Sequence, residues 1–97
     1  MIDYNSNEEK LVCSFTGKLG GAECLLWKEE LILKVRQAEN AVVFDMKDVD
    51  YVASSFLRIC IHVPKAIGSE KFSLVNVTPS VKKVFKLSGF DKILNIS

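Results

Sequence analysis

Runs of β-forming residues alternate along this chain with segments in which apolar residues recur at helical spacing. The pattern predicts the order strand, helix, strand, helix, strand, helix, strand, at residues 11–16, 22–37, 41–46, 56–63, 72–77, 78–89 and 92–96. Residues 2–4 are a candidate for a further short strand. The nearly continuous apolar run at residues 41–46 is typical of a central strand that is covered on both faces. The alternation predicts an α/β fold in which neighbouring strands are parallel.

Proline, threonine and glycine residues mark the ends of the predicted helices. Thr78 and Pro79 supply an N-cap and a first-turn proline for the third helix, and Gly89 supplies its C-terminal stop. The second helix is apolar nearly all round, which predicts a buried helix that reaches toward Gly68. Because Pro64 removes a backbone hydrogen bond, we expect a kink or a short irregular turn in the second half of this helix.

The composition and charge of the chain limit its partners. The chain has 97 residues, enough for one compact domain, and carries 13 Lys and Arg against 12 Asp and Glu, a formal net charge of +1. A charge so close to balance provides no strong field for nucleic acid, which is not an expected partner. The first residues lack the basic flank and apolar run of a signal peptide, and no later stretch suits a membrane span. We therefore expect a cytoplasmic domain over residues 1–97, without direct membrane insertion.

The cysteine, histidine and aspartate residues give little sign of catalysis or metal binding. The cysteines are Cys13, Cys24 and Cys60. Their odd number and apolar neighbourhoods favour reduced core thiols. The only histidine, His62, lies two positions from Cys60, a spacing that points the two side chains to different sides of a helix, and a core or partly buried histidine is expected. Asp45, Asp48 and Asp50 lack the glycine and distal glutamate of a calcium loop and are expected in a solvated loop. No catalytic residue, metal ligand or cofactor is assigned, and the chain is predicted not to be an enzyme.

Two adjacent serines, Ser54 and Ser55, lie between the end of a predicted strand and the buried helix. In one interpretation Ser54 is the helix N-cap, and its hydroxyl satisfies a free backbone N–H. In the other interpretation the position is functional, because free N–H groups and the positive end of the helix dipole favour a phosphate at a helix N-terminus. Both interpretations use the same geometry, and the two serines alone leave them open.

Several motifs follow one another in an order that is typical of one protein family. They are residues 16–19 (TGKL), 42–49 (VVFDMKDV), 53–57 (ASSFL), 74–81 (LVNVTPSV) and 84–90 (VFKLSGF). In turn they look like the Gly-x-Leu turn before the first helix, the central strand with its following loop, the Asp-Ser-Ser/Ala-Gly-Leu motif, and the closing strand and helix of the STAS family, the anti-sigma factor antagonists. The chain resembles this family over almost its full length. The resemblance implies a single STAS-like domain, with a mixed central β-sheet and helices packed on it.

The resemblance also implies a binding module without catalysis or cofactor. In the bacterial antagonists of this family, an anti-sigma factor serine kinase phosphorylates the first serine of the motif and a PP2C-type phosphatase removes the phosphate. Only the unphosphorylated form sequesters the kinase. The corresponding phosphoacceptor here is Ser54, with Ser55 as the alternative. The residues expected to bind the partner are Ser54, Ser55, Phe56 and Arg58.

Two residues of this chain differ from the family motif. Ala53 stands where the family has Asp, so the acidic neighbour of the acceptor serine is missing. Phe56 stands where the family has Gly, and an exposed ring there would anchor a partner. The altered motif supports a second hypothesis, in which the chain is a phosphorylation-independent STAS subunit of a signalling scaffold or of a lipid-transport ABC complex.

Overall fold

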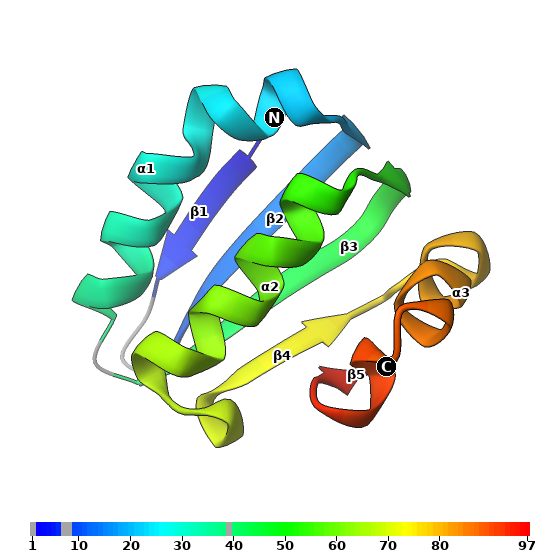
Figure 1. Ribbon diagram of the computed structural model, residues 1–97. Helices are drawn as coiled ribbons and strands as arrows, with labels where there is room; N and C mark the ends of the chain where they lie inside the picture. The colour runs from blue at the N-terminus through cyan, green and yellow to red at the C-terminus, as the bar shows by residue number, and fades with distance from the viewer. Residues whose placement is uncertain (1, 7–8, 39) are drawn as a thin grey trace.

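The computed structural model describes residues 2–6, 9–38 and 40–97 (Figure 1). The strands are β1 (Ile2–Ser6), β2 (Lys10–Leu19), β3 (Ala41–Val52), β4 (Phe72–Val75) and β5 (Asn95–Ile96). The helices are α1 (Gly21–Gln37), α2 (Ser54–Ile67) and α3 (Pro79–Leu87), with short 3-10 helices at Ser69–Lys71 and Phe90–Lys92. The predicted alternation of strands and helices is confirmed, and the candidate strand near the N-terminus is present as β1.

The strands form one five-stranded sheet in the order β1-β2-β3-β4-β5. β1 is antiparallel to β2, and the three other neighbouring pairs are parallel. Each parallel pair is joined through a segment that contains a helix, as right-handed crossover connections require. The α/β fold class with a mixed central sheet is therefore confirmed.

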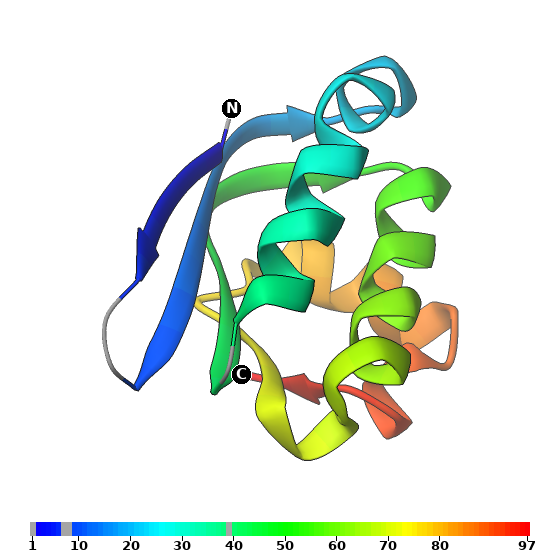
Figure 2. The same ribbon diagram turned by 90° about the vertical axis from the view of Figure 1, so that its left-hand side faces the viewer.

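α1 and α2 lie side by side on one face of the sheet, as the two perpendicular views show (Figures 1 and 2). The core lies between these helices and the sheet, where Phe15, Phe44 and Leu74 are at most 1% exposed. The intervening side chains of β3, Val43 and Asp45, point to the opposite face and are only partly buried. The prediction that both faces of this strand are covered is wrong, because both helices that follow β2 and β3 pack on the same side.

Two elements extend further than the sequence predicted. β3 continues to Val52, so Asp45, Asp48 and Asp50 lie in a strand and not in a loop. Asp48 and Asp50 are exposed, and Asp45 is partly buried. α2 stays helical through Pro64, and the expected irregular turn is absent from this helix. The backbone N–H of Gly68 donates to the carbonyl of Pro64 at 2.8 Å. Since this bond closes one more helical turn beyond the proline, the lost hydrogen bond does not end the helix.

The boundaries of α3 agree with the prediction, but one contact differs. Thr78 is the N-cap residue, and Gly89 follows the helix with a φ of 78°, in the left-handed region that favours glycine. The Thr78 hydroxyl donates to the carbonyl oxygen of Val49 at 3.0 Å instead of capping the helix. Thr78 thus ties the start of α3 to β3.

The cysteine prediction is confirmed and the histidine prediction is wrong. All three cysteines are free and buried. His62 is exposed, because the buried side of α2 is occupied by Cys60 and Val63 and position 62 faces away from both. No helix among the described residues has the length and hydropathy to span a membrane.

Candidate functional site

The N-termini of α1 and α2 meet at one edge of the sheet. Leu19 and Val52 are register partners at the ends of the parallel strands β2 and β3, and each strand leads directly into its helix. The backbone N–H of Ala53 donates to the carbonyl of Leu19 at 2.8 Å, which fixes the entry to α2 against the end of β2. The carboxyl edge of parallel strands, where helix N-termini gather, is where α/β folds place ligands and anions.

Ser54 is the first residue of α2, and the N-cap is Ala53. The carbonyl of Ala53 accepts hydrogen bonds from the backbone N–H groups of Phe56 and Leu57 at 3.0 and 3.3 Å, and Ala53 itself is extended, with φ −87° and ψ 166°. The prediction that Ser54 caps the helix is wrong by one residue. The backbone N–H groups of Ser54 and Ser55 precede the first intrahelical bond, so they are free to face a ligand.

The two serines differ in how open they are to solvent. Ser54 is exposed, whereas Ser55 is half-buried and faces α1. The Ser55 Oγ atom would lie only 3.8 Å from a Cβ added to Gly21, the first residue of α1. Neither hydroxyl makes a hydrogen bond with any described residue. The Ser54 hydroxyl is therefore the more accessible of the two.

The charges around Ser54 are compatible with an added phosphate. The first turn of α2 contains no acidic residue, since Ala53 and the serines are neutral. Arg58 follows Ser54 by four residues, is exposed, and lies on the same side of the helix. A phosphate on Ser54 would meet the helix dipole, free backbone N–H groups and this guanidinium.

Phe56 is buried in the core, so the exposed ring considered in the sequence analysis is absent. Its side chain is 0% exposed, and its ring centroid lies 5.2 Å from Phe15, 6.0 Å from Phe44 and 6.3 Å from Trp27. Position 56 is two residues beyond Ser54, so it faces the opposite side of the helix and enters the aromatic core. The bulky ring consequently leaves the surface around Ser54 open.

Comparison with known proteins places this geometry in a family. Over residues 1–97 the chain matches the family described as the STAS domain. The chain belongs to the STAS domain family. This STAS domain is 30% identical over 89 residues to BtrV of Bordetella bronchiseptica, whose provisional name is anti-sigma factor antagonist. The alignment covers 90% of this chain and 77% of BtrV.

Solved structures of anti-sigma factor antagonists share the fold of this STAS domain. One from Mycobacterium paratuberculosis has a TM-score of 0.87 at 21% identity, covering 99% of this chain and 83% of the other. SpoIIAA in its unphosphorylated form has a TM-score of 0.82 at 16% identity, covering 100% of this chain and 88% of the other. The Bacillus cell fate determinant SpoIIAA in the phosphorylated form has a TM-score of 0.75 at 16% identity, with 100% and 91% covered. At these identities the likeness establishes the fold.

Exposed leucines on α1 form a part of the STAS domain surface that the sequence did not predict. Leu25 is 78% exposed and Leu26 is 86% exposed, both within two turns of the α1 N-terminus. The sequence did contain a signal for this surface, because the helix has more leucines than one buried stripe can hold. Groups of exposed apolar side chains of this kind mark sites of protein contact.

Other polar groups of the STAS domain have structural roles. Asp45 Oδ1 accepts hydrogen bonds from the backbone N–H of Lys47 at 3.1 Å and from Asn76 Nδ2 at 3.2 Å. Among the residues that the structure describes, no three His, Cys, Asp or Glu side chains are grouped to hold a metal ion. Burial raises the pKa of the Cys13 thiol to about 12, which keeps this thiol protonated and unreactive near neutral pH.

Proposed function

We propose that this STAS domain is an anti-sigma factor antagonist that binds an anti-sigma serine kinase and is regulated by phosphorylation of Ser54. The observation that carries the proposal is the exposed Ser54 hydroxyl at the first residue of α2, beside free backbone N–H groups. A PP2C-type phosphatase would reverse the modification. The domain would act in the cytoplasm as a binding module, without catalysis or cofactor.

Three features support phosphorylation of Ser54, and the first of them favours Ser54 over Ser55. Ser54 is exposed, whereas Ser55 is half-buried against α1. The buried ring of Phe56 does not obstruct a kinase that approaches Ser54. The phosphorylated form of SpoIIAA has the same fold as this chain, which supports a fold that tolerates phosphate.

The test is phosphopeptide mapping of the protein purified from its native cells and of the protein incubated with its cognate kinase. We expect one phosphate on the peptide that contains Ser54. Ser54→Ala should abolish the modification, and the matched variant Ser55→Ala should keep it. Modification that survives in Ser54→Ala, or none at all with a kinase shown to be active on another STAS domain, would contradict the proposal.

Ala53 supports a second candidate function, in which the domain works without phosphorylation. The family's acidic neighbour of the acceptor is missing, and no other acidic residue occupies the first turn of α2. The domain would then be a subunit of a signalling scaffold or of a lipid-transport ABC complex. Co-purification with permease and ATPase subunits, together with unmodified Ser54 in native cells, would favour this candidate.

A further inference from the structure

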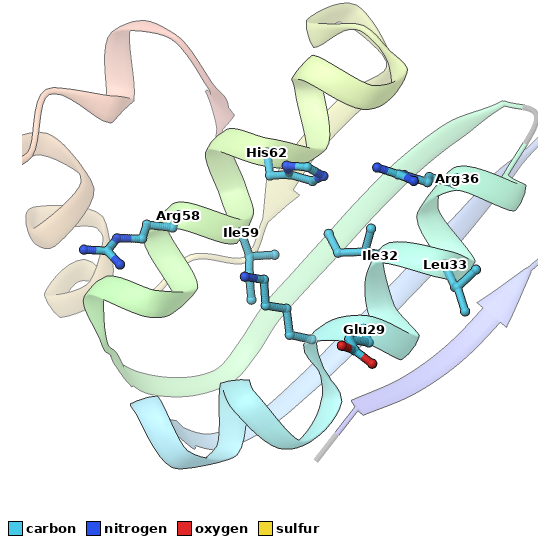
Figure 3. A pocket seen from close by; sticks show the side chains of 8 residues that line it. Glu29, Ile32, Leu33, Arg36, Arg58, Ile59 and His62 are labelled. Atoms are coloured by element: carbon cyan, nitrogen blue, oxygen red, sulfur yellow. The ribbon is translucent and has the colours of Figure 1, made fainter.

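A groove between α1 and α2 lies on the outer side of the helical layer (Figure 3). Its volume is about 580 Å³, within the range of protein binding pockets. Ile32 of α1 and Ile59 of α2 project between the two helices, and Arg36 and His62 point toward one another across the groove. The groove therefore has an apolar floor and a polar rim.

The rim carries an excess of positive charge that the domain itself does not neutralise. The residues that line the groove include three cations, Lys28, Arg36 and Arg58, and one carboxylate, Glu29, which gives a net charge of +2 from three minus one. The guanidinium of Arg58 points away from α1, so Arg58 borders the groove with its stem (Figure 3). None of these four side chains takes part in a hydrogen bond or ion pair with the described residues. Uncompensated cations around an apolar floor are complementary to an anionic partner that is also apolar.

From this charge pattern we infer that the groove binds an acidic, amphipathic segment of a protein partner. α1 and α2 run in the same direction, because each returns from the carboxyl edge of the sheet. Lys28 and Arg58 therefore lie toward one end of the groove, and Arg36 lies toward the other, ~12 Å from Lys28 along α1 at 1.5 Å per residue. A segment with acidic residues on both sides of an apolar side chain matches this arrangement.

Two features favour a protein segment over a fatty acid or another lipid with a single anionic head. They are the cations at both ends of the groove and the extent of the exposed apolar side chains. Such a lipid would engage the cations at only one end of the groove. Leu33, which lines the groove on α1, is 59% exposed, and Leu26, two turns earlier on the same side of α1, is 86% exposed, with Glu29 and Glu30 between the two leucines. A protein segment is long enough to reach from the groove to both leucines, as in helix-in-groove and peptide-binding surfaces.

This inference goes beyond the proposed function and does not depend on phosphorylation. Arg58 follows Ser54 by one helical turn, so a partner seated in the groove also approaches Ser54. The groove nevertheless uses cations of α1 that are separate from the acceptor serine. A result on the groove and a result on Ser54 can therefore succeed or fail independently.

The experiment is site-specific cross-linking in the native cells, with the photoreactive residue p-benzoyl-phenylalanine introduced in place of Leu33. The matched control introduces it in place of Leu87, a leucine on α3 that is 77% exposed against 59% for Leu33. We expect an adduct from position 33 to an acidic segment of a partner protein, identified by mass spectrometry, and at least about tenfold less of that adduct from position 87. Phosphorylation of Ser54 is measured in the same cells, so that failure of the proposed function is recorded separately.

Charge reversal tests whether the rim cations hold the segment. Lys28→Glu combined with Arg36→Glu should lower the yield of the adduct about tenfold, whereas Lys71→Glu combined with Lys92→Glu makes the same charge change elsewhere and should not. If the charge-reversed protein does not fold, Lys28→Gln combined with Arg36→Gln removes the two charges without reversing them. An adduct to a lipid, to a second copy of this chain or to a segment that is not acidic would overturn the inference. Absence of any adduct at position 33, or equal losses in both charge variants, would also overturn it.

Discussion

The two faces of α2 differ in burial and in the roles of their residues. On one face Phe56 and Cys60 are 0% exposed and pack into the core. On the other face Ser54, Arg58 and His62 are exposed, and none of them makes a hydrogen bond with the described residues. Because helical residues two apart face opposite sides, a single turn supplies both a buried core residue and an exposed serine hydroxyl.

This separation explains why the two departures from the family motif have different consequences. Phe56 adds a ring to the buried face, where it packs against Phe15 at a centroid distance of 5.2 Å. Ala53 lies at the N-cap, where it changes the charge beside Ser54 and not the packing. The comparison predicts that changes on the buried face alter stability and that changes on the exposed face alter binding.

The largest effect is expected for Phe56→Ala. Removing a fully buried ring leaves a cavity among Phe15, Phe44 and Trp27, and such truncations cost about 3–5 kcal/mol of unfolding free energy. Urea denaturation followed by circular dichroism measures this loss. The affinity of the folded fraction for the partner should not change. A stable Phe56→Ala protein that binds its partner weakly would show that the ring belongs to the binding face after all.

Alkaline pH should also act through the buried face. Burial raises the pKa of the Cys60 thiol well above its ordinary value of 9.0, and a neighbouring Cys24 adds to the shift. In the unfolded chain the thiol ionises first, so its contribution to stability is complete below about pH 9 and is lost as the pH rises toward the folded pKa. Cys13, whose pKa burial raises from 9.0 to about 12, adds an expected loss of a few kcal/mol over the same pH range.

Thermal midpoints measured between pH 7 and pH 11 test this expectation. Cys60→Ala should have a lower midpoint than the wild type at pH 7, because a buried sulfur is lost, but a smaller further decrease above pH 9. The readout is therefore the slope of stability against pH and not stability itself. Parallel curves for the two proteins would mean that the Cys60 thiol does not titrate between the folded and unfolded states.

Much of the fold could be predicted from local sequence pattern, whereas element ends could not. The alternation of strands and helices needs only the spacing of apolar residues, and Thr78 and Gly89 mark α3 correctly. β3 extends to Val52 because it pairs with β2 up to that residue. The polar residues Asp48 and Asp50 are not typical of a strand, so the local sequence pattern did not predict this extension. Pairing between distant segments is a tertiary property that overrides the local preference of the residues.

The sequence predicted a candidate site at the start of α2, and two of its side chains lie differently from the prediction. Ser54 was placed at the N-terminus of α2, and the helix starts one residue earlier than a serine cap would require. The spacing of four residues between Phe56 and Cys60 could have predicted that Phe56 is buried, because both residues then lie on the same face of the helix. The family's glycine at this position instead suggested an open surface. The groove beside the site could not be predicted, because it depends on which faces of α1 and α2 meet.

On the exposed face, phosphorylation of Ser54 should weaken partner binding and leave the fold intact. A phosphoserine adds roughly −1.5 to −2 charges at pH 7, and at this position the helix dipole, free N–H groups and Arg58 favour it. Against the partner the same charge must lose its water or meet acidic groups, so affinity should fall at least tenfold, about 1.4 kcal/mol.

Circular dichroism and partner affinity of the stoichiometrically phosphorylated protein measure both halves of this prediction. Ser54→Asp is a weaker mimic because aspartate carries less charge, and Ser55→Asp is the control for a charge placed at the less exposed serine. Undiminished affinity of the phosphoprotein would falsify the charge mechanism. Loss of the folded signal would instead show that phosphate acts through the core.

The smallest effect is expected for the stability of Ser54→Ala. A serine that caps a helix contributes about 0.5 to 2 kcal/mol, but Ser54 is exposed, lies inside the helix and makes no hydrogen bond with the described residues. Alanine also has the higher helix propensity, so the free energy of unfolding should change by less than about 0.5 kcal/mol. Urea denaturation in parallel with Ser55→Ala measures the difference between the two hydroxyls. A loss of 1 kcal/mol or more, on the scale of a cap, would mean that the hydroxyl bonds the free N–H groups in solution, and then phosphorylation would have to break that bond before it could act on a partner.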